Sequence, residues 1–219
     1  MMTMPKIHPS ILCANHGDIK GEVEKLTAVG VDYFHIDVMD GNFVPNFGCG
    51  TEIIKAVKNY TDIPLDVHLM IENPARHVDL FCDLGAAILT IHPEADKQPA
   101  RTLAAIKERG VIPGIAIKPD TSIEDVKEFL PLCGYVLAMT VNPGYGGQSF
   151  LESTVDKIKN LGILAQEYGF ALCVDGGINA QLAHRLWEYG VTNFVMGNAL
   201  FKGNYLEVMN EVRAVSSAE

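Results

Sequence analysis

Short apolar segments alternate with longer amphipathic segments along the whole chain. The short segments have the length and composition of buried strands, and the longer ones place apolar residues at the spacing of a helix that covers a sheet. The predicted strands are residues 7–12, 33–38, 65–70, 87–92, 112–117, 135–141, 171–174 and 193–196. The predicted helices are residues 18–29, 51–59, 74–84, 99–109, 122–130, 151–168, 180–189 and 205–215.

Most of the predicted helices are followed by a glycine, the residue that a left-handed helix end favours. These glycines are Gly30, Gly85, Gly110, Gly134, Gly169 and Gly190. Eight parallel strands with covering helices can close into a barrel or remain open as a doubly wound sheet. We predict an α/β fold, a single-domain TIM (β/α)8 barrel over residues 1–219, because there are eight strands and no GxGxxG motif follows the first one.

Composition and charge narrow the classes of function. The chain has 17 basic and 27 acidic side chains, and its formal net charge of −10 argues against nucleic acid or an anionic membrane as a partner. We expect a cytoplasmic protein, because there is neither a signal peptide nor a run of ~18 apolar residues. The five cysteines are widely spaced and form no CxxC pair, which indicates buried thiols in a reducing compartment. We also expect a homo-oligomer.

Candidate chemistry is concentrated in residues 34–46. Side chains alternate along a strand, so His35, Asp37 and Met39 share one face and the apolar residues between them share the other. A buried charge must be paired or bound to a metal. The strand ends at Asp40-Gly41, a turn signal, and the polar face therefore lies at the end of the barrel where TIM-barrel active sites are found. The alternative is a barrel interior held together by ion pairs.

The ends of the other predicted strands add further polar and sulfur-bearing side chains. They are Ser10, Asp66, His68, Met70, His92, Glu94, Lys118, Met139, Asn142 and Asp175. Together, the two imidazoles and two carboxylates of His35, Asp37, His68 and Asp175 suit a divalent metal ion, with Zn²⁺ favoured and Fe²⁺, Mn²⁺ or Co²⁺ as alternatives. A lone His68 would more often hydrogen-bond Asp66 or a neighbouring strand, but a second strand with a histidine and a carboxylate at alternate positions favours the metal.

Other residues at these strand ends have less specific interpretations. Met39, Met70 and Met139 either fill the core or form a water-poor floor beside the substrate. We interpret His92 and Lys118 as local hydrogen-bond or ion-pair partners.

Three glycine-containing loops suggest a site for phosphate. They are residues 142–148, which include Gly144, Gly146 and Gly147; Gly176-Gly177; and Gly197-Asn198. Glycine lets backbone N–H groups approach an anion, and helix N-termini carry partial positive charge. The loops follow the sixth, seventh and eighth strands, and TIM barrels often bind phosphate after strands seven and eight.

Several segments together resemble the signature blocks of the ribulose-phosphate 3-epimerase family. They are PSIL at 9–12, HIDVMDG at 35–41, FVPN at 43–46, DVHLM at 66–70, MTVNPGYGGQ at 139–148 and VDGG at 174–177. The resemblance covers residues 6–203 and implies a metal-dependent TIM-barrel enzyme that interconverts ribulose 5-phosphate and xylulose 5-phosphate. It implies that His35, Asp37, His68 and Asp175 are metal ligands, that Asp37 and Asp175 are also the acid/base pair, and that Ser10 contacts substrate.

The full set of substrate-binding residues that we expect combines the strand ends with the loops. It comprises Ser10, His68, Met39, Met70, Met139, Gly144, Gly146, Gly147, Gly176, Gly177, Gly197 and Asn198. The chain departs from the family pattern at Asn15, Pro93 and Asn198; Asn198 keeps a side-chain donor, so we expect phosphate binding to survive. The alternatives are a hexulose-phosphate epimerase, such as an allulose-6-phosphate 3-epimerase, and a non-catalytic barrel that binds sugar phosphate and signals to a partner.

Overall fold

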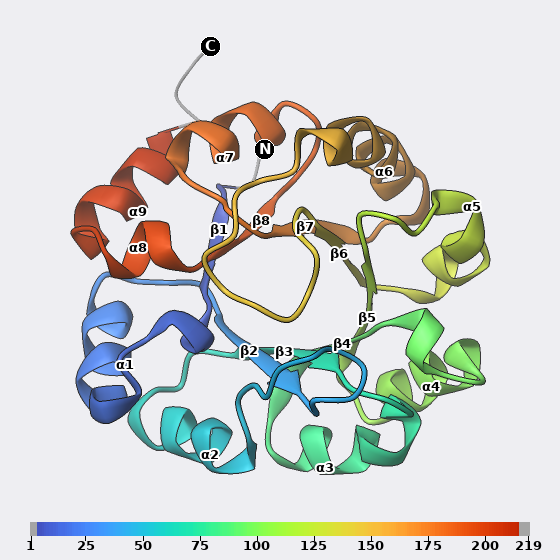
Figure 1. Ribbon diagram of the computed structural model, residues 1–219, viewed down its shortest axis with the longest axis horizontal. Coiled ribbons are helices and arrows are strands. Elements are labelled where there is room, and N and C mark those ends of the chain that lie inside the picture. Colours follow the sequence, from blue (N-terminus) through green and yellow to red (C-terminus); the bar gives the residue numbers. More distant parts are fainter. Residues whose placement is uncertain (1–3, 215–219) are drawn as a thin grey trace.

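The computed structural model describes residues 4–214, in which eight parallel strands form a ring surrounded by helices (Figure 1). The strands are β1 (Lys6–Pro9), β2 (Phe34–Met39), β3 (Leu65–Met70), β4 (Ala86–Ile91), β5 (Ile112–Ile117), β6 (Tyr135–Met139), β7 (Ala171–Asp175) and β8 (Asn193–Met196). The α-helices are α1 (Ile19–Ala28), α2 (Thr51–Tyr60), α3 (Val78–Asp83), α4 (Pro99–Glu108), α5 (Ile123–Val126), α6 (Val155–Tyr168), α7 (Ala180–Trp187), α8 (Asn198–Phe201) and α9 (Tyr205–Arg213).

Strand pairing confirms the TIM barrel. The hydrogen-bonded order is β1-β8-β7-β6-β5-β4-β3-β2. Between β1 and β2 the ring is completed by a parallel bridge that joins Ser10 to His35, and by the Asp32 N–H, which donates to the Ile7 carbonyl at 3.1 Å. Residues 10 and 35, both part of the predicted chemistry, therefore lie side by side.

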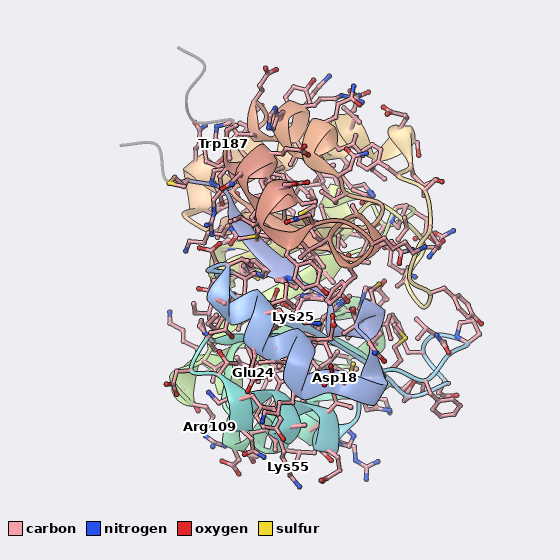
Figure 2. All side chains as sticks on the ribbon, turned by 90° about the vertical axis from the view of Figure 1, so that its left-hand side faces the viewer. Asp18, Glu24, Lys25, Lys55, Arg109 and Trp187 are labelled. Atoms are coloured by element: carbon pink, nitrogen blue, oxygen red, sulfur yellow. The ribbon has the colours of Figure 1, made fainter. Side chains whose placement is uncertain are left out.

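The apolar residues separate into layers. The largest buried cluster lies between the strands and the helices and includes Phe34, Ile36 and Val38, the face of β2 that alternation assigned to packing. A second cluster, which includes Leu137 and Met139, fills part of the barrel interior. Charged side chains such as Glu24 and Lys25 on α1 face solvent on the outside of the ring (Figure 2). The rest of the barrel interior holds buried polar side chains of the strands, such as His35, Asp66 and His68.

Some element ends differ from the prediction. The strand predicted over 7–12 ends at Pro9, because the chain turns after Ser10 into the 3₁₀ helix Ile11–Cys13. The strand predicted over 135–141 ends at Met139, and Thr140 instead donates its N–H to the Asp175 carbonyl at 2.7 Å. Just beyond both ends the backbone still pairs with neighbouring strands, because the Ser10 N–H donates to the Met196 carbonyl at 2.9 Å.

Several helices also differ from their predicted extents. Over 122–130 the structure has the short α5 followed by a 3₁₀ segment that contains Pro131, which cannot continue an α-helix. The short α8 after β8 was not predicted, and the last residue predicted for the final helix, Val215, lies outside the described residues.

The glycines after the predicted helices have left-handed backbone at every predicted position except Gly134. There the preceding 3₁₀ segment ends in extended backbone at Cys133, and the Gly134 N–H pairs with the Pro113 carbonyl at 2.9 Å.

Two loops cover the C-terminal ends of the strands. The loop after β6 crosses the opening of the ring (Figure 1), and the side view shows that it projects from the same end as the loop after β2 (Figure 2). Two hydrogen bonds join these loops: Asn46 Nδ2 donates to the Gly144 carbonyl at 2.8 Å, and the Tyr145 hydroxyl donates to the Pro45 carbonyl at 2.7 Å. The loops thus enclose the space above the barrel.

Candidate active site

A cavity of about 400 Å³ lies at the C-terminal ends of the strands. Most of the predicted site residues form its wall. They are Ser10, Asp37, Met39, Met70, Met139, Gly144, Gly146, Gly147, Asp175, Gly176, Gly177, Gly197 and Asn198. The two predicted histidine ligands, His35 and His68, do not border the cavity; they are fully buried.

Four side chains meet at one point beside this cavity. His35, Asp37, His68 and Asp175 each offer a ligand atom, and these atoms all lie within 4.8 Å of one another. Strand β2 supplies His35 and Asp37 from alternate positions, and register places His68 of β3 opposite Asp37. Asp175 comes from the last position of β7. The structure thus brings the predicted ligand set together.

Asp37 is the common hydrogen-bond partner in this cluster. Its Oδ1 lies 3.1 Å from His35 Nε2 and 3.2 Å from His68 Nδ1. Its Oδ2 accepts a hydrogen bond from the Ser10 hydroxyl at 2.6 Å. The nitrogens turned toward the centre of the cluster are therefore Nε2 of His35 and Nδ1 of His68.

The outer nitrogen of His35 is held by Asp66. Asp66 Oδ2 lies 2.9 Å from His35 Nδ1, 2.9 Å from His8 Nδ1 and 2.9 Å from the Tyr135 hydroxyl. His8 Nε2 in turn lies 3.0 Å from Asn193 Oδ1. All of these side chains are buried in the barrel interior. Asp66 therefore contacts His35, whereas His68 hydrogen-bonds Asp37 on the neighbouring strand β2.

The outer nitrogen of His68 has a different partner. His68 Nε2 lies 2.9 Å from His92 Nε2, and His92 Nδ1 lies 3.7 Å from Glu94 Oε1. Lys118 Nζ is 3.2 Å from the same Glu94 oxygen. His92 and Lys118 are thus the local hydrogen-bond and ion-pair partners that the sequence indicated.

The two cavity aspartates have opposite protonation tendencies. Burial and the charge of Asp37 raise the pKa of Asp175 to about 7. Burial also disfavours the charged form of Asp37, but the charge and hydrogen bonds of His35 and His68 outweigh it and hold the pKa of Asp37 far below its ordinary value. Two neighbouring carboxyl groups whose pKa values are driven apart are typical of acid/base pairs.

The donor set fits a divalent metal ion. Two imidazole nitrogens and two carboxylates converge, and hydrogen bonds hold the far nitrogen of each ring, which is the support that metal-bound histidines usually have. Burial lowers the pKa of His68, which favours the neutral form that binds metal. The charges of Asp37 and Asp66 outweigh burial and raise the pKa of His35, so an incoming ion would displace its Nε2 proton.

Among the described residues, glycines and no basic side chains border the cavity at the loops after β6, β7 and β8. Within residues 4–214, no lysine or arginine borders the cavity, whereas Gly146, Gly147, Gly177 and Gly197 do. Gly177 has a φ of +67°, and a Cβ there would lie 2.5 Å from the Phe150 nitrogen. An anion in this part of the cavity would have to be held by N–H groups rather than by side-chain cations.

Sequence reasoning missed several residues of the site. Leu12, Cys13 and Phe150 also border the cavity. Cys13 follows the PSIL block directly and could have been found by extending it, whereas Leu182 on α7 carries no signal in the sequence. The network of His8 and Tyr135 around Asp66 also went unrecognised, since it joins three strands that are distant in sequence.

Comparisons with known proteins agree on one family and one fold. The ribulose-phosphate 3 epimerase family matches residues 6–201. The ribulose-phosphate 3-epimerase of Bacillus subtilis is 41% identical over 96% of this chain and 99% of its own length, and that of Escherichia coli K12 is 38% identical over 95% and 94%. The chloroplastic ribulose-5-phosphate-3-epimerase of Arabidopsis thaliana is 38% identical over 95% of this chain and 76% of its own.

Solved structures with low sequence identity share the fold. The 3-keto-L-gulonate-6-phosphate decarboxylase of Vibrio cholerae superposes with a TM-score of 0.77 at 16% identity, covering 98% of each chain. A tryptophan synthase chain of Mycobacterium tuberculosis superposes with a TM-score of 0.69 at 15% identity, covering 99% of this chain and 94% of that one.

Between residues 4 and 214, no helix combines the length and hydropathy needed to span a membrane.

Proposed function

Since this chain belongs to the ribulose-phosphate 3-epimerase family, we propose that it inverts carbon 3 of a ketopentose phosphate and so interconverts ribulose 5-phosphate and xylulose 5-phosphate. The main structural support for this proposal is the position of two aspartates. Asp37 and Asp175 reach the same cavity from β2 and β7, two strands that are not neighbours in the ring. Inversion at carbon 3 requires two such groups, one for each face of the carbon.

Proton transfer is the work of the two aspartates. The hydrogen on carbon 3 lies next to the C2 carbonyl, so its removal gives an enediolate. One carboxylate removes this hydrogen, and the other, in its protonated form, delivers a proton to the opposite face. The reverse reaction exchanges the two roles. The Ser10 hydroxyl, which donates to Asp37 Oδ2 at 2.6 Å, orients that carboxylate and leaves Oδ1 directed at the two histidines.

His35, Asp37, His68 and Asp175 would hold a divalent metal ion, which supplies Lewis acidity for the negative charge that develops on the substrate. Zn²⁺ suits this nitrogen and oxygen donor set best, with Fe²⁺, Mn²⁺ and Co²⁺ as alternatives. His35 and His68 are ligands in this proposal. His68 was also predicted to bind substrate, but both histidines are fully buried and neither borders the cavity.

The glycine loops bind the phosphate group and thereby set the position of carbon 3. Backbone N–H groups near Gly146, Gly177 and Gly197 approach an anion closely because no side chain stands in the way. At the other end of the cavity, Met39, Met70 and Met139 give an apolar wall that limits water around the reacting carbon.

A coupled assay of purified protein on ribulose 5-phosphate tests this function. We expect turnover to xylulose 5-phosphate, loss of activity after chelation, and recovery when Zn²⁺ or another divalent ion is returned. A six-carbon ketose phosphate is assayed in parallel, and faster turnover of it would reassign the substrate. Absence of epimerisation of both sugars in metal-loaded protein would overturn the proposal.

A further inference from the structure

His68, His92 and Glu94 lie in a row behind the proposed metal site and form a chain of one hydrogen bond and one longer contact. The chain runs from His68 Nε2 to His92 Nε2 at 2.9 Å, and from His92 Nδ1 to Glu94 Oε1 at 3.7 Å. Both rings are fully buried, and Glu94 is partly exposed beside Lys118. A line of polar groups therefore connects the proposed metal site to the surface.

Two facing ring nitrogens can share only one proton. When His68 Nδ1 binds metal, the proton of the neutral ring is on Nε2, and His92 Nε2 must then accept it. The proton of neutral His92 is consequently on Nδ1, the nitrogen that faces Glu94. Within the described chain, His92 Nδ1 is a buried atom with no hydrogen-bond partner, and Glu94 Oε1 is near enough to become its acceptor after a shift of less than about 1 Å.

Local structure holds His92 and Glu94 in place. Pro93 separates them and opens the 3₁₀ helix Pro93–Ala95, where its fixed φ limits the backbone between the two side chains. The ring of Phe43 lies against the His92 ring with centroids 4.8 Å apart. Lys118 Nζ, 3.2 Å from Glu94 Oε1, limits the movement of that carboxylate.

We propose that His92 and Glu94 are positioning residues that hold His68 with Nδ1 directed at the metal and Nε2–H directed away from it. This inference rests on the metal site of the proposed function. Asp66 supports His35 directly with a carboxylate, whereas support for His68 passes through a second imidazole that needs Glu94 to define its own proton position. Pro93, a departure from the family pattern, then serves the site by fixing the spacing of the pair.

NMR of Zn²⁺-loaded protein with ¹⁵N-labelled histidine tests the proton positions. We expect His92 to be protonated on Nδ1 only, and His68 to be protonated on Nε2 with Zn²⁺ on Nδ1. Protonation of His92 on Nε2, together with a response of His35 to Zn²⁺, would overturn this inference while leaving the metal site intact. A spectrum in which neither His35 nor His68 responds to Zn²⁺ would overturn both.

Zn²⁺ affinity of variants, measured by competition with a chromophoric chelator, tests the energetic role. We expect His92→Phe to bind Zn²⁺ about 10- to 100-fold more weakly, the usual loss when support of a ligand is removed. His92→Gln keeps an oxygen that can accept from His68 and should lose much less. Equal affinity of His92→Phe and the unmodified protein, or equal losses in His92→Phe and His92→Gln, would overturn the proposal.

A milder variant guards against misfolding. Glu94→Gln removes only the charge of the final acceptor, and we expect it to weaken Zn²⁺ binding severalfold without lowering the thermal stability of metal-free protein. The matched control is Glu124→Gln, because Glu124 is an exposed glutamate whose Oε1 lies 3.3 Å from Lys127 Nζ, and none of its contacts involves His68, His92 or Glu94. Equal Zn²⁺ affinity in Glu94→Gln and Glu124→Gln would contradict the role of Glu94.

Discussion

Replacing Gly177 with alanine separates the phosphate-binding role of the glycine loops from ordinary backbone strain. Gly177 has a φ of +67°, and a Cβ there would lie 2.5 Å from the Phe150 nitrogen and 2.9 Å from the Gln148 carbonyl oxygen. These are backbone atoms of the loop that covers the cavity, so they cannot rotate away. Gly169, at the end of α6, has a similar φ of +80° but no atom within 4 Å of its Cβ position. Gly169→Ala is therefore the matched control.

Backbone strain and loss of phosphate contact should have effects of different size. Left-handed backbone costs a non-glycine residue about 1–2 kcal/mol, and both variants should lose this much stability. Gly177→Ala must in addition push the loop after β6 away from the loop after β7. Loss of one N–H contact to a charged group costs about 1.5–3 kcal/mol, which corresponds to roughly a 10- to 150-fold rise in KM.

Steady-state kinetics on ribulose 5-phosphate and thermal unfolding of both variants provide the assay. We expect a decrease in Tm for both variants, larger for Gly177→Ala because its Cβ also meets the backbone of the covering loop. We expect a large rise in KM for Gly177→Ala alone and a smaller change in kcat. An unchanged KM in folded Gly177→Ala would place the phosphate elsewhere. A comparable rise in KM for Gly169→Ala would show that strain, and not contact with the covering loop, is responsible.

Two further predictions concern the metal ligands. Purified protein should hold about one divalent ion per chain, and His68→Ala should hold much less because it has lost a ligand. The variant His184→Ala, away from the ligand set, should keep its ion. Full metal occupancy and activity in His68→Ala would refute this ligand assignment. In chelated protein, the raised pKa of Asp175, about 7, means that stabilisation present below pH ~4 is lost as pH rises through 7. Asp175→Asn cannot lose this stabilisation. Its free energy of unfolding relative to the unmodified chain should therefore rise over this range by about 1.4 kcal/mol for each pH unit by which folding raises the pKa of Asp175. A difference in the free energy of unfolding that stays constant between pH 4 and pH 8 would contradict the raised pKa of Asp175.

The barrel could be predicted from the sequence because one kind of pattern repeats around it. Apolar strands that alternate with amphipathic helices leave few parallel arrangements, and β2 shows the expected separation of Phe34 and Ile36 from His35 and Asp37. The ends of elements were less predictable. Apolar residues continue past Pro9 and Met139, but the backbone there pairs with neighbours that only the closed ring brings close.

The candidate site also has a part that the sequence predicted and a part that it did not. Residues at the ends of strands, such as Asp37 and Asp175, could be placed together because the ends of parallel strands meet at one face of a barrel. Contacts that depend on side-chain direction could not be placed: the sequence did not reveal that Asp66 supports His35 or that His68 meets His92. Such contacts are set by register and rotamer across strands, which the sequence pattern does not specify.

Exchange of the hydrogen on carbon 3 with heavy water tests the two-carboxylate reaction most directly. Asp37→Asn and Asp175→Asn are each incubated with pure ribulose 5-phosphate and with pure xylulose 5-phosphate, and metal content is measured alongside so that only metal-replete protein is compared. We predict that net epimerisation is abolished in both variants, and that each variant incorporates deuterium from one epimer only, with opposite epimers for the two. Near-normal interconversion by either metal-replete variant, or exchange of the same epimer by both, would contradict a reaction with one carboxylate on each face of carbon 3.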